Sequence, residues 1–418
     1  MRTPLGTAII ISIMILLDFY VFSGLHSVLG SASAKTQTII YVLYWLVVLL
    51  AMAGLVLFIF TDPSFMTKKV RTYLFATILA LVFAQMVASL FLVIDDLRRM
   101  VEWMVLKIVA KSATAGTLSG DAIPRSVFLT WAGLGAGTAL FGSLIYGFTN
   151  KYNYRVKRIR LPFANLPAAF NGLKIVHFSD VHSGSFMNKK AVEEGVKKIM
   201  EQNADMVIFS GDLVNDRATE MKNYMNVFSR ISAPMGVYST LGNHDYGDYV
   251  KWPHEGVTRE QNLIHLTEVH QQLGWKLLMN EHVVFEKNGE KIALIGIENW
   301  SAKARFPKHG DMKKAYAGTE HYPFKILISH DPSHWDAQVR PDYGDVDLTL
   351  SGHTHGMQFG VEIPGFKWSP VQYFYKEWDG LYEQGNQKLY VNPGFGFIGY
   401  PGRVGIMPEI TLIELTSG

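Results

Sequence analysis

The chain of 418 residues has 39 lysines and arginines against 36 aspartates and glutamates, so its formal net charge is only +3. With so small an excess and no arm rich in arginine and lysine, the charge gives no reason to expect nucleic acid as a partner. The chain contains no cysteine, which excludes disulfides, thiolate metal ligands and cysteine nucleophiles. Any metal ion must therefore be held by histidine, aspartate, glutamate, asparagine or backbone oxygen.

Four long apolar runs fill the first 150 residues, and each is long enough to cross a bilayer as a helix of about 20 residues. They cover residues 5–24, 39–60, 73–94 and 127–148. The first run is too long for a signal peptide and has no small-residue cleavage site. We predict an all-helical transmembrane region over residues 1–150 and a separate domain over residues 151–418, in a multi-pass protein of the cell (inner) membrane.

Three features of the transmembrane region need interpretation. Asp18 lies inside the first run, where an ionisable side chain is costly; we expect it near the interface or bonded to a neighbouring helix, with a functional role as the alternative. Gly133 and Gly137 have a spacing that suits close helix packing. Residues 95–111 are either an interfacial amphipathic helix or an extension of the third run. No series of polar residues marks a transport path, so the predicted role is an anchor, near a lipid-borne substrate.

The distribution of cations gives an expectation for the membrane side, because cationic residues favour the cytoplasm. If all four runs cross the membrane, Arg2 and the second domain lie on the same side. Two basic groups lie on that side too. The first group is Lys68, Lys69 and Arg71, and the second is Lys151, Arg155, Lys157, Arg158 and Arg160. The opposite side has Lys35, Arg98, Arg99, Lys107, Lys111 and Arg125. We therefore expect a cytoplasmic domain. The extracytoplasmic side stays open, because the last basic group can belong to the folded domain and residues 125–137 resemble a weakened twin-arginine export signal.

From about Tyr154 onward, short runs rich in valine, isoleucine and phenylalanine alternate with polar amphipathic segments, which indicates an α/β arrangement. The expected strands are residues 173–180, 204–212, 235–245, 291–299, 324–331 and 346–355, with two more near the end. Residues 191–202 have apolar positions at helical spacing and are expected to form a helix.

Five of these strands share one property, since each is followed at its C-terminal end by residues that can bind a metal ion. These residues are Asp180 and His182, Asp212, Asn243 and His244, His330, and His353 and His355. In open α/β sheets, ligands bind outside the carboxyl ends of the strands. A single histidine after an apolar strand is more often structural, but five such ends in one chain favour a common metal site.

The chemistry of these groups indicates two metal ions. Imidazole and carboxylate ligands without thiolate suit Mn, Fe or Zn better than Ca, and seven ligands drawn from this set suit two ions that share a bridging carboxylate. Two ions about 3.5–4 Å apart clamp the attacking and leaving oxygens of an in-line displacement at phosphorus. Because a metal lowers the pKa of bound water to about 7, the expected nucleophile is a metal-bound hydroxide. A histidine beside the ions would protonate the leaving oxygen.

The five blocks resemble, in order and spacing, those of the calcineurin-like metallophosphoesterases. They are DVH (180–182), GD (211–212), GNHD (242–245), the isolated His330 and GHTH (352–355). The resemblance covers about 60% of the chain, from Leu173 onward. The tail after residue 389 looks like the membrane-associated bacterial branch, which includes phosphodiesterases acting near the cell envelope. The resemblance implies an α/β (α+β) fold, a two-sheet sandwich flanked by helices.

Residue by residue, the resemblance also implies the roles of the site. It implies one ion held by Asp180, His182, Asp212 and His355. It implies a second ion held by Asp212, Asn243, His330 and His353, with Asp212 as the bridge. His244 matches the histidine of the family that is not a ligand, contacts the phosphate and protonates the leaving group. Asp245 is expected to orient His244.

Two positions depart from the family pattern. Met357 stands where related sequences have the second glycine of GHTHGGQ, which puts the substrate geometry in doubt but not the metals. Residues 392–394 read NPG where N-R-G is expected, and Arg403 either replaces the missing arginine or is a plain surface residue. His177 is expected to pack in the core. The aromatic-rich residues 365–380 form either a core or lid segment or an apolar wall for a lipid or sugar-nucleotide group.

We predict a membrane-anchored dinuclear metal-dependent phosphoesterase that hydrolyses a phosphodiester or a phosphomonoester, with a lipid-linked substrate as an expectation. One alternative is a lipid-pathway pyrophosphatase that cleaves a nucleotide-linked lipid such as UDP-diacylglucosamine, as some relatives do. An alternative of another class is a non-catalytic membrane scaffold or sensor. The complete ligand set argues against the scaffold, because a vestigial site would lose ligands.

Overall fold

In a computed structural model, the protein divides into two compact units, Met1–Tyr146 and Gly147–Gly418. The structure describes residues 4–62, 65–112 and 123–418. Arg2, one of the cations counted for the membrane side, lies outside the described residues.

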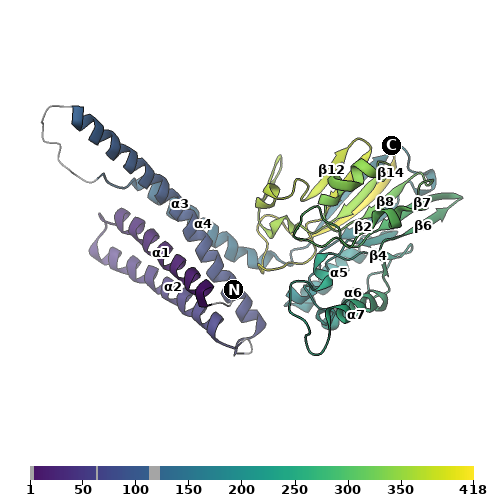
Figure 1. Ribbon diagram of the computed structural model, residues 1–418, viewed down its shortest axis with the longest axis horizontal. Coiled ribbons are helices and arrows are strands. Elements are labelled where there is room, and N and C mark those ends of the chain that lie inside the picture. Colours follow the sequence, from purple (N-terminus) through teal and green to yellow (C-terminus); the bar gives the residue numbers. More distant parts are fainter. Residues whose placement is uncertain (1–3, 63–64, 113–122) are drawn as a thin grey trace. The chain divides into compact units, whose positions relative to one another are not determined.

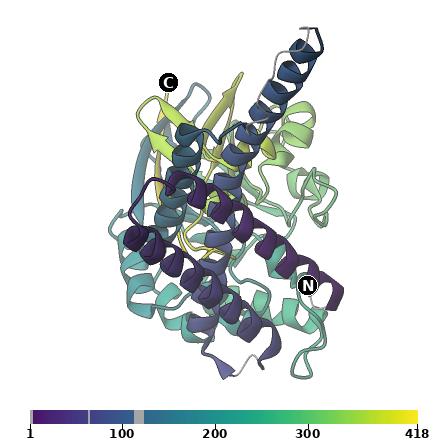
Figure 2. The ribbon, with the colours of Figure 1, turned by 90° about the vertical axis from the view of Figure 1, so that its left-hand side faces the viewer.

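Long helices build the first unit (Figure 1): α1 Pro4–Val28, α2 Ala34–Phe60, α3 Lys68–Ser112 and α4 Val127–Asn150, whose last turn belongs to the second unit. Each is long and apolar enough to cross a membrane. Helix α3 is continuous over 45 residues, so residues 95–111 extend the third span and do not form a separate interfacial helix. Figure 2 shows α3 reaching past the paired helices α1 and α2.

Contacts between these helices explain why glycine stands at position 137 and how the Asp18 side chain is accommodated inside the first span. A Cβ at Gly137 would lie 2.6 Å from the carbonyl oxygen of Ala84, so only glycine lets α4 approach α3 this closely. Asp18 is buried and accepts a hydrogen bond from Gln85 of α3. The prediction that Asp18 bonds to a neighbouring helix is therefore confirmed.

Two six-stranded sheets, flanked by helices, form the second unit (Figure 1), which confirms the predicted sandwich. The first sheet has the order β1-β14-β2-β3-β4-β5. Its strands are β1 Arg155–Phe163, β2 Lys174–Phe178, β3 Met206–Phe209, β4 Val237–Ser239, β5 Lys276–Leu277 and β14 Glu409–Ser417. The second sheet has the order β12-β13-β9-β8-β7-β6. Its strands are β6 Glu281–Lys287, β7 Glu290–Gly296, β8 Lys325–Ile328, β9 Leu348–Ser351, β12 Gly380–Gln384 and β13 Gln387–Val391. A separate hairpin joins β10 Val361–Ile363 to β11 Phe366–Trp368.

Both faces of each sheet are covered, which explains the continuous apolar runs in the sequence. Side chains of β2 alternate, so that Ile175 enters the core between the sheets while Val176 packs towards the helices on the outer face. The helices that contribute to the outer core of the first sheet are α5 Lys189–Met200, α6 Met225–Phe228 and α7 Arg259–Gln272. Those beside the second sheet are α8 Met312–Tyr316 and the π-helix η6 Trp335–Val339, which is followed by the short helix α9 Arg340–Asp342.

Strand β1 contains most of the basic group that precedes the domain, and the sequence did not indicate it as a strand. It pairs in parallel with β14 at the edge of the first sheet. Cations are common on edge strands because they discourage pairing with another chain. Two of them also meet carboxylates, with Arg160 Nε 3.0 Å from an oxygen of Glu414 and Lys157 Nζ 3.9 Å from one of Glu409.

Candidate metal centre

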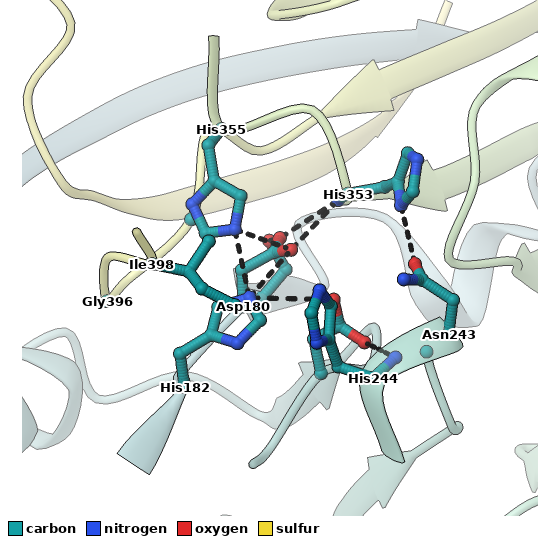
Figure 3. Close-up of polar contacts among 12 residues, drawn as sticks. Asp180, His182, Asn243, His244, His353, His355, Gly396 and Ile398 are labelled. Atoms are coloured by element: carbon teal, nitrogen blue, oxygen red, sulfur yellow. Dashed lines mark hydrogen bonds and ion pairs between the residues drawn. The ribbon is translucent and has the colours of Figure 1, made fainter. Parts of the chain in front are cut away.

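The candidate ligands meet where parallel strands of the two sheets end. Strands β2, β3 and β4 are parallel neighbours in the first sheet, and β8 and β9 are parallel neighbours in the second. Parallel strands deliver the residues that follow them to the same edge. The loops after these five strands hold all the candidate site residues, and Figure 3 shows several of them pointing towards one another.

The loops reach this arrangement through left-handed backbone conformations. Five candidate ligands have φ between 47° and 72°: Asp180, His182, Asp212, His353 and His355. Such values are uncommon outside glycine, although aspartate and histidine adopt them more readily than most residues. The neighbouring Gly352 permits a close approach, because a Cβ there would collide with the carboxylate of Asp180. This collision accounts for the glycine of the GHTH block.

One group of potential ligands consists of Asp180, His182 and His355, all buried. The Nε2 atoms of His182 and His355 are 3.0 Å apart, and His355 Nε2 is 3.3 Å from Oδ1 of Asp180 (Figure 3). Three ligand atoms thus converge on one point.

The other group consists of Asp212, His330 and His353. Oδ2 of Asp212 lies 3.2 Å from Nε2 of His330 and 3.5 Å from Nε2 of His182 in the first group. Asn243 joins this group, because its Oδ1 is 2.7 Å from Nδ1 of His353. Asp212 therefore stands between the two groups, where a bridging carboxylate would be.

Carbonyl oxygens determine which ring nitrogen of two histidines faces the site. His330 donates from Nδ1 to the carbonyl oxygen of Ser210, at 2.7 Å, and His244 donates from Nδ1 to that of Asn215, at 2.7 Å. A carbonyl can only accept, so in the neutral form Nε2 of each ring carries the lone pair. For His330 this is the nitrogen that lies beside Asp212.

Burial and neighbouring charges set the protonation of the centre. Burial lowers the pKa of His182 to about 3 and that of His353 to about 4, which keeps both rings neutral, as metal ligands must be. For His330, burial also lowers the pKa, but the Asp212 carboxylate outweighs it and raises the value to about 10. Burial alone would raise the pKa of Asp212, yet His330 and the other imidazoles bring it well below its usual range.

The donor set fits divalent cations. Nε2 of His330 is buried and makes no well-aligned hydrogen bond, although buried polar atoms are normally paired; it faces the Asp212 carboxylate at 3.2 Å. The two facing nitrogens of His182 and His355 belong to rings whose pKa values burial lowers, so neither has a strong reason to hold a proton. Cations would satisfy these lone pairs and screen the Asp180 and Asp212 carboxylates from each other.

Asp245 differs from its prediction. Its carboxylate does not bond to the ring of His244; it accepts hydrogen bonds from the backbone N–H groups of Asp212, Leu213, Val214 and Gly242, at 2.8–3.2 Å. Asp245 therefore stabilises the loop that carries Asp212. The carbonyl of Asn215 orients the His244 ring instead, and a carbonyl contact leaves no signal in side-chain patterns.

Two residues that the sequence did not single out hold His353. Nε2 of His353 lies 2.8 Å from the hydroxyl of Tyr375 and 3.5 Å from Oδ2 of Asp331, and the same hydroxyl donates to Asp331 at 3.1 Å. A carboxylate behind a ligating imidazole fixes the ring and makes it a better ligand. The adjacency of Asp331 to His330 was a possible signal, whereas nothing in the sequence connects Tyr375 to His353.

Arg403 has neither of the two roles considered for it, which were replacement of the missing arginine and a plain surface position. It is completely buried, and its guanidinium donates to the carbonyl oxygens of Pro393 and Gly396, at 2.8 and 2.6 Å. It is therefore not a surface residue, and within the described chain it does not line the cavity over the centre. Arg403 stabilises the loop behind His355.

His177 is buried and contacts the hydroxyl of Ser210, which confirms its predicted core role.

A cavity of about 850 Å³ opens over the ligands. Its floor includes Asp212, Asn243, His244, His353 and His355. Its walls include two cationic side chains and a larger apolar and aromatic set: Lys303, Arg305, Phe306, Met357, Val371, Tyr373, Phe374, Tyr375 and Ile398. Part of the aromatic-rich stretch is thus a cavity wall. Met357 has φ of 55°, a left-handed conformation that glycine adopts without strain.

Comparison with known families identifies the domain. The family described as "Calcineurin-like phosphoesterase" matches residues 173–357, which contain all the candidate site residues. Residues 173–357 are a calcineurin-like phosphoesterase domain. The family described as "Probable Calcineurin-like phosphoesterase, transmembrane domain" matches residues 1–151. Both matched families are described as calcineurin-like phosphoesterases, which confirms the resemblance found in the sequence.

Relatives of this phosphoesterase occur in animals and bacteria. A "Transmembrane protein with metallophosphoesterase domain" of Danio rerio is 31% identical over 65% of this chain and 60% of that protein. The "Uncharacterized metallophosphoesterase YkuE" of Bacillus subtilis is 28% identical over 60% of this chain and 82% of that protein. The alignment with the Danio rerio protein spans only 60% of its length, and that with its Bos taurus counterpart spans 57%. The solved structure of a Haemophilus influenzae NAD nucleotidase matches 54% of this chain and 45% of its own, at 16% identity and a TM-score of 0.36.

Proposed function

We propose that this membrane phosphoesterase is a dinuclear hydrolase of phosphodiesters or phosphomonoesters. The observation that supports it most directly is the position of Asp212 between two groups of buried ligands, 3.2 Å from His330 and 3.5 Å from His182. Two divalent cations of Mn, Fe or Zn type would supply an activated water and neutralise charge at the phosphoryl group. The ligands proposed for them are Asp180, His182, Asp212, Asn243, His330, His353 and His355.

The residues of the chain would then divide the work. His244 lines the cavity, and because its Nδ1 is bonded to Asn215, its Nε2 is the atom that would hold a proton for the leaving oxygen. Its backbone N–H donates to Oδ1 of Asp212 at 2.8 Å, which leaves Oδ2 of that carboxylate for the ions. Asp245, through its four backbone contacts, keeps Asp212 in place.

The cavity walls support an amphiphilic substrate. Val371, Phe374 and Met357 offer an apolar surface beside the phosphoryl site, which suits a lipid-linked phosphodiester. Lys303 and Arg305 line the same cavity and would hold a second phosphate. That pair of cations favours the second candidate, a pyrophosphatase acting on a nucleotide-linked lipid such as UDP-diacylglucosamine.

Paired variants test the proposal. Asp212→Asn should lose most hydrolysis of a generic phosphodiester and about one metal equivalent by elemental analysis, because it weakens the proposed bridge. His244→Ala should keep both metals and lose turnover, whereas His265→Ala, which removes an exposed histidine of α7, should change neither. Wild-type activity in Asp212→Asn would refute the bridge, and metal loss in His244→Ala would make that residue a ligand.

A substrate panel separates the candidate functions. Purified protein is assayed with a lipid-linked phosphodiester, a nucleotide-linked lipid diphosphate and a water-soluble phosphodiester. Preference for the diphosphate, lost in Arg305→Ala, would support the pyrophosphatase. Two bound metals without hydrolysis of any substrate would support the scaffold or sensor.

The cytoplasmic placement of the domain stays a prediction with a weaker basis. Arg155, Lys157, Arg158 and Arg160 were counted as flanking charges, but they belong to strand β1. Without them, five cations remain on the side of the domain and six on the other, so the charge bias that sets orientation disappears. Protease accessibility in intact cells measures the side directly: resistance supports the cytoplasm and cleavage refutes it.

A further inference from the structure

Exposed apolar side chains gather on two consecutive segments of the chain, and the second of these lines the cavity with Tyr373 and Phe374. They lie on the β10–β11 hairpin and on the short helix η8 (Pro370–Tyr373) with the residue after it. We call them the rim, and they are Val361, Ile363, Phe366, Tyr373 and Phe374. Ile363 is 57% exposed, Phe366 54%, Tyr373 73% and Phe374 62%. Large exposed apolar clusters on folded domains mark interaction sites.

The hairpin itself is amphipathic. Val361 pairs with Trp368 and Ile363 with Phe366, so these four apolar side chains share one face. Glu362 and Lys367 pair on the opposite face, where Lys367 Nζ lies 3.4 Å from the Glu362 carboxylate.

The charged face of the hairpin is attached to the domain. Nζ of Lys367 lies 2.6 Å from Oδ2 of the buried Asp379 and stands over the ring of Trp378. In a water-facing hairpin the apolar face would cover the core and the charged face would meet solvent. Here the order is reversed, as expected of a surface that meets an apolar phase.

The base of the hairpin is connected by hydrogen bonds to the first residue of this unit, Gly147. Gly360 and Gln358, just before β10, exchange backbone hydrogen bonds with Val404, at 2.8 and 2.9 Å. The adjacent Arg403 donates from its backbone to the carbonyl of Gly147, at 2.9 Å. Gly147 lies in the last turn of α4, the fourth candidate span. One short segment therefore connects the hairpin to the last turn of α4.

We infer that the rim inserts into the lipid surface and that the cavity takes its phosphoester from that surface. Interfacial proteins bury such apolar faces at the boundary between headgroups and acyl chains. Lys303 and Arg305 line the cavity and stand over the rings of Tyr375 and Phe306, respectively. Among the described residues neither has a carboxylate within ion-pair distance, so both can bind the phosphate of a lipid headgroup. What enters the cavity rests on the proposed function, whereas the membrane contact of the rim does not.

The absence of cysteine from the chain makes the contact directly measurable. The full chain carrying Ile363→Cys is labelled with an environment-sensitive fluorophore and reconstituted in phosphatidylethanolamine–phosphatidylglycerol vesicles. Ile264→Cys on α7 is the matched control, because Ile264 is 56% exposed and Ile363 57%. The label at residue 363 should shift to the blue and be quenched by quenchers attached to lipid chains. Emission equal to that of the label at residue 264 would overturn the inference.

Activity provides the second measurement. Phe366→Asp, which lies outside the cavity lining of the described chain, should lower kcat/KM about tenfold or more on a phosphodiester embedded in vesicles, because a charge opposes insertion. On a water-soluble phosphodiester it should match both wild type and the Ile264→Asp control. Equal loss on both substrates, or loss on neither, would overturn the inference. If wild type hydrolyses neither substrate, the proposed function fails, and the label measurement still decides the membrane contact.

Discussion

The contact of Asp331 with His353 leads to a prediction about metal affinity. Asp331 is completely buried; its Oδ2 lies 3.5 Å from Nε2 of His353 and accepts from the Tyr375 hydroxyl at 3.1 Å. Oδ1 accepts from the backbone N–H of Ser333 at 2.8 Å. Asp331→Asn keeps the size of the side chain and removes the negative charge behind the imidazole.

Removing a partner of a ligating histidine costs about 10–100-fold in metal affinity, or about 1.4–2.7 kcal/mol. The loss should fall on the ion of the Asp212 group, because His353 belongs to that group and not to the one with Asp180. Asp331→Asn is therefore expected to release one metal equivalent at chelator concentrations that leave wild type with two.

The assay is a chelator titration of purified protein, followed by elemental analysis. Tyr375→Phe is the matched variant: it removes one hydroxyl and keeps the carboxylate, so its titration should lie between those of wild type and Asp331→Asn. A wild-type titration for Asp331→Asn would refute the reasoning, since the carboxylate would then have no influence on the ligand. Equal loss of both ions would show that Asp331 supports the whole centre and not one group.

Other residues give further expected outcomes. Burial lowers the pKa of His270 to about 3, below its ordinary 6.5, so the unfolded chain takes up a proton first and stability falls as pH drops from 6.5 towards 3; the slope is about 1.4 kcal/mol per pH unit. His270→Gln should flatten this part of the thermal stability profile, and an unchanged slope would contradict the assignment. Gly352→Ala should expel the ion of the Asp180 group, since the new Cβ meets that carboxylate, whereas Gly344→Ala, where a Cβ meets nothing, should keep both ions by elemental analysis. Met357→Gly relieves a left-handed backbone and shortens the cavity wall, so KM for a substrate with an apolar group should rise while Tm changes by only a few degrees.

The strand ends of the centre could be predicted because the signal is local. An apolar run followed by aspartate or histidine fixes both the strand and the place where its ligand emerges, as Asp180 and Asp212 show. The sandwich followed from the same runs, since strands buried on both faces read as continuous apolar segments. The resemblance then supplied the pairing of residues from different strands, which spacing alone could not.

The rest depends on contacts between distant segments or on backbone atoms. Strand β1 was missed because its basic residues were interpreted as flanking charges, although Ile159, Leu161 and Phe163 occupy alternate positions and pack in the core between the sheets. The partner of His244 is the carbonyl of Asn215, and every residue has a carbonyl. The second strand of the hairpin lies in the aromatic-rich stretch and was not predicted. The face on which Lys367 lies depends on its ion pair with Asp379, twelve residues further along the chain.

The left-handed conformations of five proposed ligands also limit how the centre can change by mutation. A residue with a branched Cβ pays about 1–2 kcal/mol or more at such a φ, while glycine and asparagine adopt it readily. At Asp180, Asp212 or His355, a change that abolishes catalysis but spares the fold would therefore lead to asparagine or glycine far more often than to valine or isoleucine. Descendants of this chain that had lost the proposed metal site and kept the fold would be recognisable by asparagine or glycine at those positions.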